Sequence, residues 1–290
     1  MFVEVLDAEI NLRVPNLFEL LYENAAYARF LVHREGDLGR KAAYRFVESF
    51  LKEYDEVYRT STLDYAKEIF EILVVVREER LSPSKFKKRL RTIKYEIPHD
   101  KVRVKLPLVK LGKATLEFTP YTYRIPGGSR KDPVNLVFWN QGRYGNVLDI
   151  MHNYLKPPWK FTKNFFLTCA ETQYLYVNGE WVKMTASLSP HGCRLGRRLH
   201  ARLFTTGEYD NNFGYVTFSA AHEEDFSFQN IFTSGTPHKI VGWDSARDFL
   251  ENQFKIAGTF TKSVARMQIQ PSGVLQGVMH DGYACFVEVL

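Results

Sequence analysis

The chain has few cysteines and lacks the short glycine motifs that hold nucleotides or expose a nucleophilic serine. Its three cysteines, Cys169, Cys193 and Cys285, are widely spaced and form no Cys-x-x-Cys pair. This pattern argues against a disulfide framework and a cysteine-rich zinc site, and it favours a reducing compartment. No Gly-x-Gly-x-x-Gly, Walker-type phosphate loop or Gly-x-Ser-x-Gly occurs. The sequence therefore lacks the local signatures of dinucleotide binding, P-loop nucleotide binding and serine-hydrolase chemistry.

Long apolar runs are also absent. The most apolar stretch, residues 69–76, contains Glu71 and is far shorter than the roughly 20 residues that a membrane helix requires. The first nine residues, MFVEVLDAE, carry acids where a secretory signal needs positive charge. We therefore expect a cytoplasmic protein without a transmembrane segment. With 45% hydrophobic residues over 290 positions, the chain has ample material for a buried core.

Positive charge is concentrated in one segment. The net charge is +6, yet residues 77–113 hold thirteen Lys or Arg against four acids, a balance of +9, so the remainder sums to −3. Such a block is compatible with a polyanion, either nucleic acid or an anionic membrane surface. It is equally compatible with a solvated basic face, and it contains few aromatics for base stacking. The residues at which nucleic acid would bind are Lys85, Lys87, Lys88, Arg89 and Arg91.

The hydrophobic pattern predicts an α+β protein in three segments. Residues 1–97 are expected to be a helical region with a basic C-terminal arm, with helix starts at Asn16, Leu38, Ser61 and Ser82. Residues 98–131 are expected to be a basic β bridge and linker, because Lys and Arg alternate with apolar residues from Lys101 onward. Residues 132–290 are expected to form a mixed or antiparallel sheet with a few helices.

Two hairpins are predicted in the last segment. Asn178-Gly179 suits a two-residue turn with positive φ at both positions. Asp281-Gly282 is expected to join strands at residues 274–279 and 283–289.

A strand at residues 198–203 carries the most distinctive pattern. Its even positions, Arg198, His200 and Arg202, would share one polar face while the odd positions enter the core. Guanidinium groups bind phosphate or carboxylate oxygens, and a histidine between them titrates near neutrality. The alternative is a solvated face whose basic residues pair with Glu223 or Asp225 on a neighbouring strand.

Two later histidines extend this pattern. His222 ends an apolar strand and precedes two carboxylates, but Phe226 stands where an HExxH zinc motif needs its second histidine. His238 is followed by Asp244 and Arg247. The histidines at 200, 222 and 238 do not have a local ligand spacing, so a divalent metal would require the fold to bring them together. The cofactor therefore stays open at the level of sequence.

Residues 132–254 resemble the LssY C-terminal domain family. The resemblance is carried by the DPVNLVF stretch that begins at Asp132, by the Arg-His-Arg strand, by the strand that ends at His222, and by the run from His238 to the DSARDF helix start. The family often has two adjacent histidines in its Arg-rich strand, where this chain has Leu199-His200, and some members carry a membrane-embedded phosphatase-type domain that this sequence lacks. The resemblance implies a shared site rather than a named reaction.

These observations lead to two hypotheses of different classes. The first is a hydrolase-like or ligand-binding site for a phosphorylated or otherwise anionic substrate, with catalytic His200, His222 and His238 and with substrate held by Arg198, Arg202, Arg247 and Asp244. The second is a non-catalytic module that binds nucleic acid or another polyanion through the basic segment. A structural protein, in which every one of these histidines is a satisfied core or surface residue, is the third reading.

Overall fold

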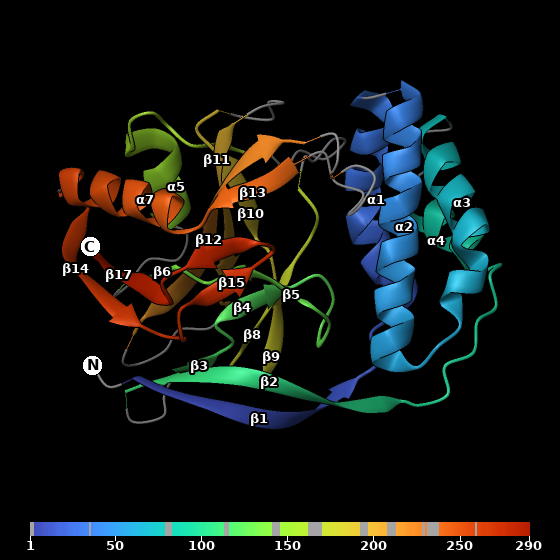
Figure 1. Ribbon diagram of the computed structural model, residues 1–290, viewed down its shortest axis with the longest axis horizontal. Coiled ribbons are helices and arrows are strands. Elements are labelled where there is room, and N and C mark those ends of the chain that lie inside the picture. Colours follow the sequence, from blue (N-terminus) through green and yellow to red (C-terminus); the bar gives the residue numbers. More distant parts are fainter. Residues whose placement is uncertain are drawn as a thin grey trace.

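The fold combines a bundle of helices with two large β-sheets and a two-stranded one (Figure 1). The computed structural model describes residues 3–34, 36–78, 83–112, 116–140, 146–161, 170–191, 197–207, 213–227, 230, 238–258 and 260–290. Among these residues no helix is both long enough and apolar enough to cross a membrane. The α+β class expected from the sequence is confirmed at this coarse level.

Four helices form the bundle. They are α1 (Leu17–Arg34), α2 (Gly36–Tyr58), α3 (Ala66–Glu78) and α4 (Pro83–Leu90), with a 3-10 turn η1 (Thr62–Tyr65) before α3. The predicted start at Asn16 is confirmed, because its Oδ1 accepts a hydrogen bond from the Phe18 N–H at 2.9 Å. Leu and aromatic side chains at helical spacing fill the bundle core, where the rings of Tyr27 and Phe46 meet edge to face at 5.1 Å between centroids.

The beginning of the chain differs from the predicted helical region 1–97. Residues 3–13 form strand β1 (Val3–Arg13), which pairs antiparallel along its whole length with β2 (Lys101–Leu111). The half-exposed basic strand predicted after residue 98 is confirmed, but its outer face is partly neutralised, because Glu9 lies 3.6 Å from Arg103 and 3.5 Å from Lys105. Ala8, Ile10 and Leu12 alternate with polar residues, and this period of two is the signal for β1 in the sequence.

The first sheet has seven strands. Its order is β1-β2-β3-β8-β4-β5, with β9 paired to β8, and strands from all three predicted segments take part in it. The remaining bounds are β3 (Leu116–Phe118), β4 (Tyr121–Tyr123), β5 (Arg130–Pro133), β8 (Tyr174–Val177) and β9 (Glu180–Lys183).

The second sheet has eight strands and carries the histidines. Its order is β14-β17-β6-β12-β11-β10-β7, with β13 paired to β12, and β17 with β6 is its parallel pair. The bounds are β6 (Leu136–Asn140), β7 (Lys160–Phe161), β10 (Ala186–Ser189), β11 (Arg198–Thr205), β12 (Tyr215–Phe226), β13 (His238–Gly242), β14 (Thr261–Gln268) and β17 (Tyr283–Val289).

Apolar layers lie on both sides of the second sheet. Phe118 and Phe218 meet at 4.7 Å between ring centroids in the core that joins the two sheets. On the other face, Phe138 packs at 4.9 Å against Phe254 of α7 (Asp244–Ile256). The helix predicted at 146–155 is present as α5 (Asn146–Asp149) followed by a π-helical turn η2 (Ile150–Tyr154), and it shares this core. Strands β11 and β12 are therefore buried on both faces.

One predicted hairpin is confirmed and the other is wrong. Asn178 and Gly179 have φ of 46° and 92° and join β8 to β9. The strands near the C-terminus pair differently from the prediction, since β15 (Gly273–Leu275) and β16 (Val278–His280) pair with each other while β17 pairs with β14 and β6. The chain turns back at Gln276 and Gly277 between β15 and β16, whereas Gly282, with φ of +80°, lies between β16 and β17.

Candidate functional site

The polar face of β11 meets the polar face of β12 inside the protein. The antiparallel register places Arg198 opposite Glu224 and His200 opposite His222. These four side chains are buried, and the exposed fraction of His222 is 0%. The alternative of a solvated strand face is therefore wrong. Because burying a charge or an imidazole is costly unless it has partners, these side chains must pair with one another or with neighbouring groups.

The two imidazoles form the centre of a polar cluster. His200 Nδ1 lies 3.1 Å from His222 Nε2, and the ring centroids are 4.8 Å apart. His222 Nε2 also lies 3.3 Å from Glu224 Oε2, while His200 Nε2 contacts the Ser187 hydroxyl. Burial and the neighbouring Arg202 hold the pKa of His200 well below its usual value.

Two buried ion pairs flank the histidines. Arg198 pairs with Glu224 and Arg202 pairs with Asp132, which lies at the end of β5. Asp132 Oδ2 also lies 3.5 Å from His222 Nδ1. Burial raises the pKa of Glu224, but Arg198 more than offsets this effect, so that the pKa lies well below its usual value. The predicted partners Glu223 and Asp225 are replaced by Glu224 and Asp132, because these carboxylates are on the buried side of their strands.

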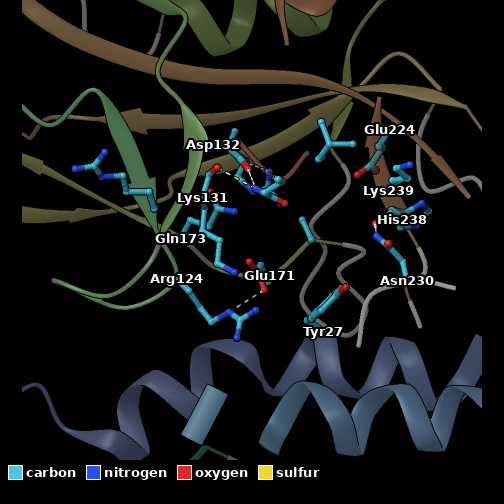
Figure 2. A pocket seen from close by; sticks show the side chains of 15 residues that line it. Tyr27, Arg124, Lys131, Asp132, Glu171, Gln173, Glu224, Asn230, His238 and Lys239 are labelled. Atoms are coloured by element: carbon cyan, nitrogen blue, oxygen red, sulfur yellow. Dashed lines mark hydrogen bonds and ion pairs between the residues drawn. The ribbon is translucent and has the colours of Figure 1, made fainter. Parts of the chain in front are cut away.

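A pocket of about 360 Å³ opens beside this cluster (Figure 2). Tyr27 of α1 closes one side of it, Lys131 and Gln173 lie on a second, and Glu224 and His238 lie on a third. Five basic side chains line it: Arg124, Arg130, Lys131, Arg202 and Lys239. Three acidic ones line it: Asp132, Glu171 and Glu224. The lining therefore holds two more basic than acidic side chains.

The basic groups of the pocket are partly desolvated. Burial lowers the pKa of Lys131, and among the described residues no carboxylate lies within 4.0 Å of its ammonium group. Burial by itself would raise the pKa of Glu171. The positive charges of Arg124, Lys131 and Arg202 outweigh burial, so the pKa lies below its usual value. Arg124 Nε lies 3.5 Å from Glu171 Oε2. The Nε of Arg202 is buried and has no hydrogen-bond partner in the described part of the chain. Lys131 therefore has no described carboxylate at ion-pair distance, and Arg202 keeps one N–H without a described partner.

The residues predicted from the sequence are only partly brought together. Arg202 and His238 line the pocket, and the exposed fraction of His238 is 8%. His200, His222 and Arg198 lie behind the wall that Glu224 and Arg202 form, and none of the three lines the pocket. A direct proton exchange between a pocket ligand and His200 or His222, as expected from the sequence, is therefore not supported by their positions.

Arg247 and Asp244 belong to a different network. The buried Arg247 guanidinium contacts Asp244 at 3.3 Å, Asp248 at 2.8 Å and Asp281 at 2.6 Å. Neither Arg247 nor Asp244 lines the pocket. These contacts tie the start of α7 to Asp281, which lies just before β17, so the structure gives Arg247 a role in holding α7 rather than in holding the predicted substrate.

The basic residues predicted to bind nucleic acid lie on α4 of the helical bundle and just after it. Lys85 and Lys88 on α4 and Arg91 just after it are exposed, Arg89 is half-buried, and the side chain of Lys87 lies outside the described residues. Leu90 is fully buried, which fixes α4 to the bundle with its charged side outward. None of these basic residues lines the pocket. Their contact with nucleic acid stays a prediction.

Several residues of the site were missed by sequence reasoning. Lys131, Glu171, Arg124 and Ser187 carry no local signal, because they reach the site from separate loops and strands. Asp132 stood in the stretch that carried the family resemblance, but its pairing with Arg202 depends on how the two sheets meet.

Comparison with known proteins finds no match. No protein-family model, no curated protein and no solved structure is significantly similar to this chain. The argument on function therefore depends on the geometry described above.

Proposed function

We propose that the protein binds a small anion, of the phosphate or phosphoester class, in the pocket between α1 and the two sheets. The single observation that carries this proposal is the charge of the pocket lining: five basic against three acidic side chains around about 360 Å³, with Arg124 and Arg202 buried and Arg130 and Lys239 exposed. A volume of this size suits a compact ligand rather than a polymer. Arg202 adds a donor, since its Nε has no hydrogen-bond partner in the described part of the chain.

The chemistry of the donors supports an oxyanion. Guanidinium groups bind phosphate oxygens through paired N–H donors, and a lysine adds a point charge. Burial lowers the pKa of Lys131 by disfavouring its charged form. A bound anion would offset this effect, because an opposite charge favours the charged form of a lysine. The site would thus be more stable with the anion than without it.

The resemblance to the LssY C-terminal domain family is part of this proposal. The residues that carry it include Asp132, Arg202 and His238, and all three line the pocket. Glu224, two residues after His222, is a further lining residue. If the family shares a site, we propose that it is this pocket, with His238 as the histidine nearest to the ligand.

The proposal is tested by binding of inorganic phosphate to the full chain. Isothermal titration calorimetry should detect saturable binding that weakens as chloride concentration rises. Lys131→Gln should weaken binding roughly 10- to 150-fold, which is the loss of one charged hydrogen bond. Lys160→Gln, an exposed lysine on β7 outside the pocket, should bind phosphate as the unaltered protein does. Equal loss in both variants, or no binding at all by the unaltered protein, would refute a pocket site.

A further inference from the structure

The cluster behind the pocket wall has the donor set of a metal site. His200, His222 and Glu224 each offer one ligand atom, and these three atoms lie within 4.8 Å of one another. No short sequence motif predicts this group, because His200 and His222 come to lie opposite each other only through the register of β11 and β12. We propose that these three side chains bind one divalent transition-metal ion, with zinc as the best match.

Two of the three distances between donor atoms are close to those around a tetrahedral ion, and the third is at most 4.8 Å. Ligands held 2.0–2.2 Å from a tetrahedral zinc are about 3.3–3.6 Å apart. His200 Nδ1 and His222 Nε2 are 3.1 Å apart, and His222 Nε2 and Glu224 Oε2 are 3.3 Å apart. Small outward shifts of the side chains would open these edges to the required length. Two imidazoles with one carboxylate are also a donor set that zinc uses when it keeps a fourth position for water or another ligand.

Each of the three ligands has a partner on the side away from the ion. His200 Nε2 contacts the Ser187 hydroxyl, and Asp132 Oδ2 lies 3.5 Å from His222 Nδ1. Arg198 pairs with Glu224. Groups of this kind fix the ring orientation of a metal-bound histidine and raise its basicity. The cluster is therefore built in two layers, as protein metal sites are.

The charges of the cluster indicate what completes the site. Glu224 and Asp132 are balanced by Arg198 and Arg202, so a divalent ion would add two positive charges to a buried region. Hydroxide or another anion in the fourth position reduces this charge. Glu224 belongs to the cluster and also lines the pocket, so such an anion would approach from the pocket side. The metal would then strengthen the binding of an oxyanion there.

The same side chains also satisfy one another as a hydrogen-bond chain without an ion. Arg202 lies 3.4 Å from His222 Nδ1 and can donate to it, while the His222 Nε2–H faces both His200 and Glu224. The two descriptions differ in one measurable property, which is the uptake of metal at a fixed stoichiometry.

The test uses the full chain after removal of any purification tag. The protein is stripped with a chelator, dialysed into a chloride buffer without phosphate, and titrated with Zn²⁺ and, separately, with Co²⁺. We expect one ion per chain by elemental analysis and a visible Co²⁺ spectrum of tetrahedral type. His222→Gln should lose stoichiometric uptake, and Asp132→Asn should weaken it about 10- to 100-fold. His280→Gln, which alters a buried histidine outside the group, should keep both the uptake and the spectrum.

The outcomes are distinct. A stripped protein that takes up no stoichiometric ion, or a His222→Gln variant that still gives the same Co²⁺ spectrum, overturns the metal site. If His222→Gln does not fold by circular dichroism, Ser187→Ala is used, and its Co²⁺ spectrum or affinity must change because Ser187 contacts His200. Because phosphate is absent from the buffer, failure here does not bear on the anion pocket, and failure of phosphate binding does not bear on this site.

Discussion

Removing Arg198 should destabilise the protein far more than removing its sequence neighbour Arg197. Arg198 is 1% exposed and pairs with the buried Glu224, whereas Arg197 is 68% exposed and pairs with Glu223 at 2.5 Å. Breaking a buried ion pair leaves a charge without compensation and costs about 3–5 kcal/mol. That loss is a large part of a total stability of about 5–15 kcal/mol. At roughly 2–4 °C per kcal/mol, Arg198→Met should lower Tm by roughly 6–20 °C.

The assay is thermal and urea unfolding of stripped protein followed by circular dichroism. Arg197→Met, the matched control, should leave Tm unchanged because its ion pair is in contact with solvent. The double variant Arg198→Met/Glu224→Gln should cost less than the sum of the two single variants, because neither buried charge remains. Additive losses, or equal losses for Arg197→Met and Arg198→Met, would refute the claim that the Arg198–Glu224 pair acts as a buried unit.

Two further predictions concern pH and backbone geometry. Burial raises the pKa of Glu251, but hydrogen bonds from Lys255 and Arg266 outweigh burial and lower it. Its contribution to stability is therefore present above the ordinary carboxyl pKa and lost as the pH falls through the lowered value, so Glu251→Gln should flatten the acid limb of a Tm-against-pH curve. Gly282 and Gly277 have φ of +80° and +77°, but a Cβ would lie 2.1 Å from a backbone oxygen only at Gly282. Gly282→Ala should thus lower Tm much more than Gly277→Ala, and equal effects would mean that the backbone around Gly282 and Gln270 relaxes freely.

Local patterns were sufficient for the helices. Asn16 and Pro83 predicted starts that the structure has at Leu17 and Pro83, because capping chemistry and the 3.6-residue period act within a few residues. The turn at Asn178-Gly179 was likewise predictable from the sequence, since positive φ at two successive positions restricts the residue types that can occupy them.

Strand pairing was not determined locally. The chain segment at 3–13 was expected to belong to a helical region, yet it pairs with β2 almost ninety residues later along the sequence. The hairpin expected at Gly282 is absent because β17 finds its partners in β6 and β14. A strand shows its alternation in the sequence but not the identity of its neighbour, which depends on contacts distant in the chain.

The sequence by itself determined that Arg198, His200 and Arg202 share one face of a strand, because side chains alternate along any strand. Only the tertiary structure decided that this face is buried, that Glu224 and Asp132 neutralise it, and that His222 meets His200. The physical reason is that burial and charge pairing are properties of surfaces that come together in space. The order of residues fixes which groups a surface offers, and the packing of β10, β11 and β12 fixes what they meet.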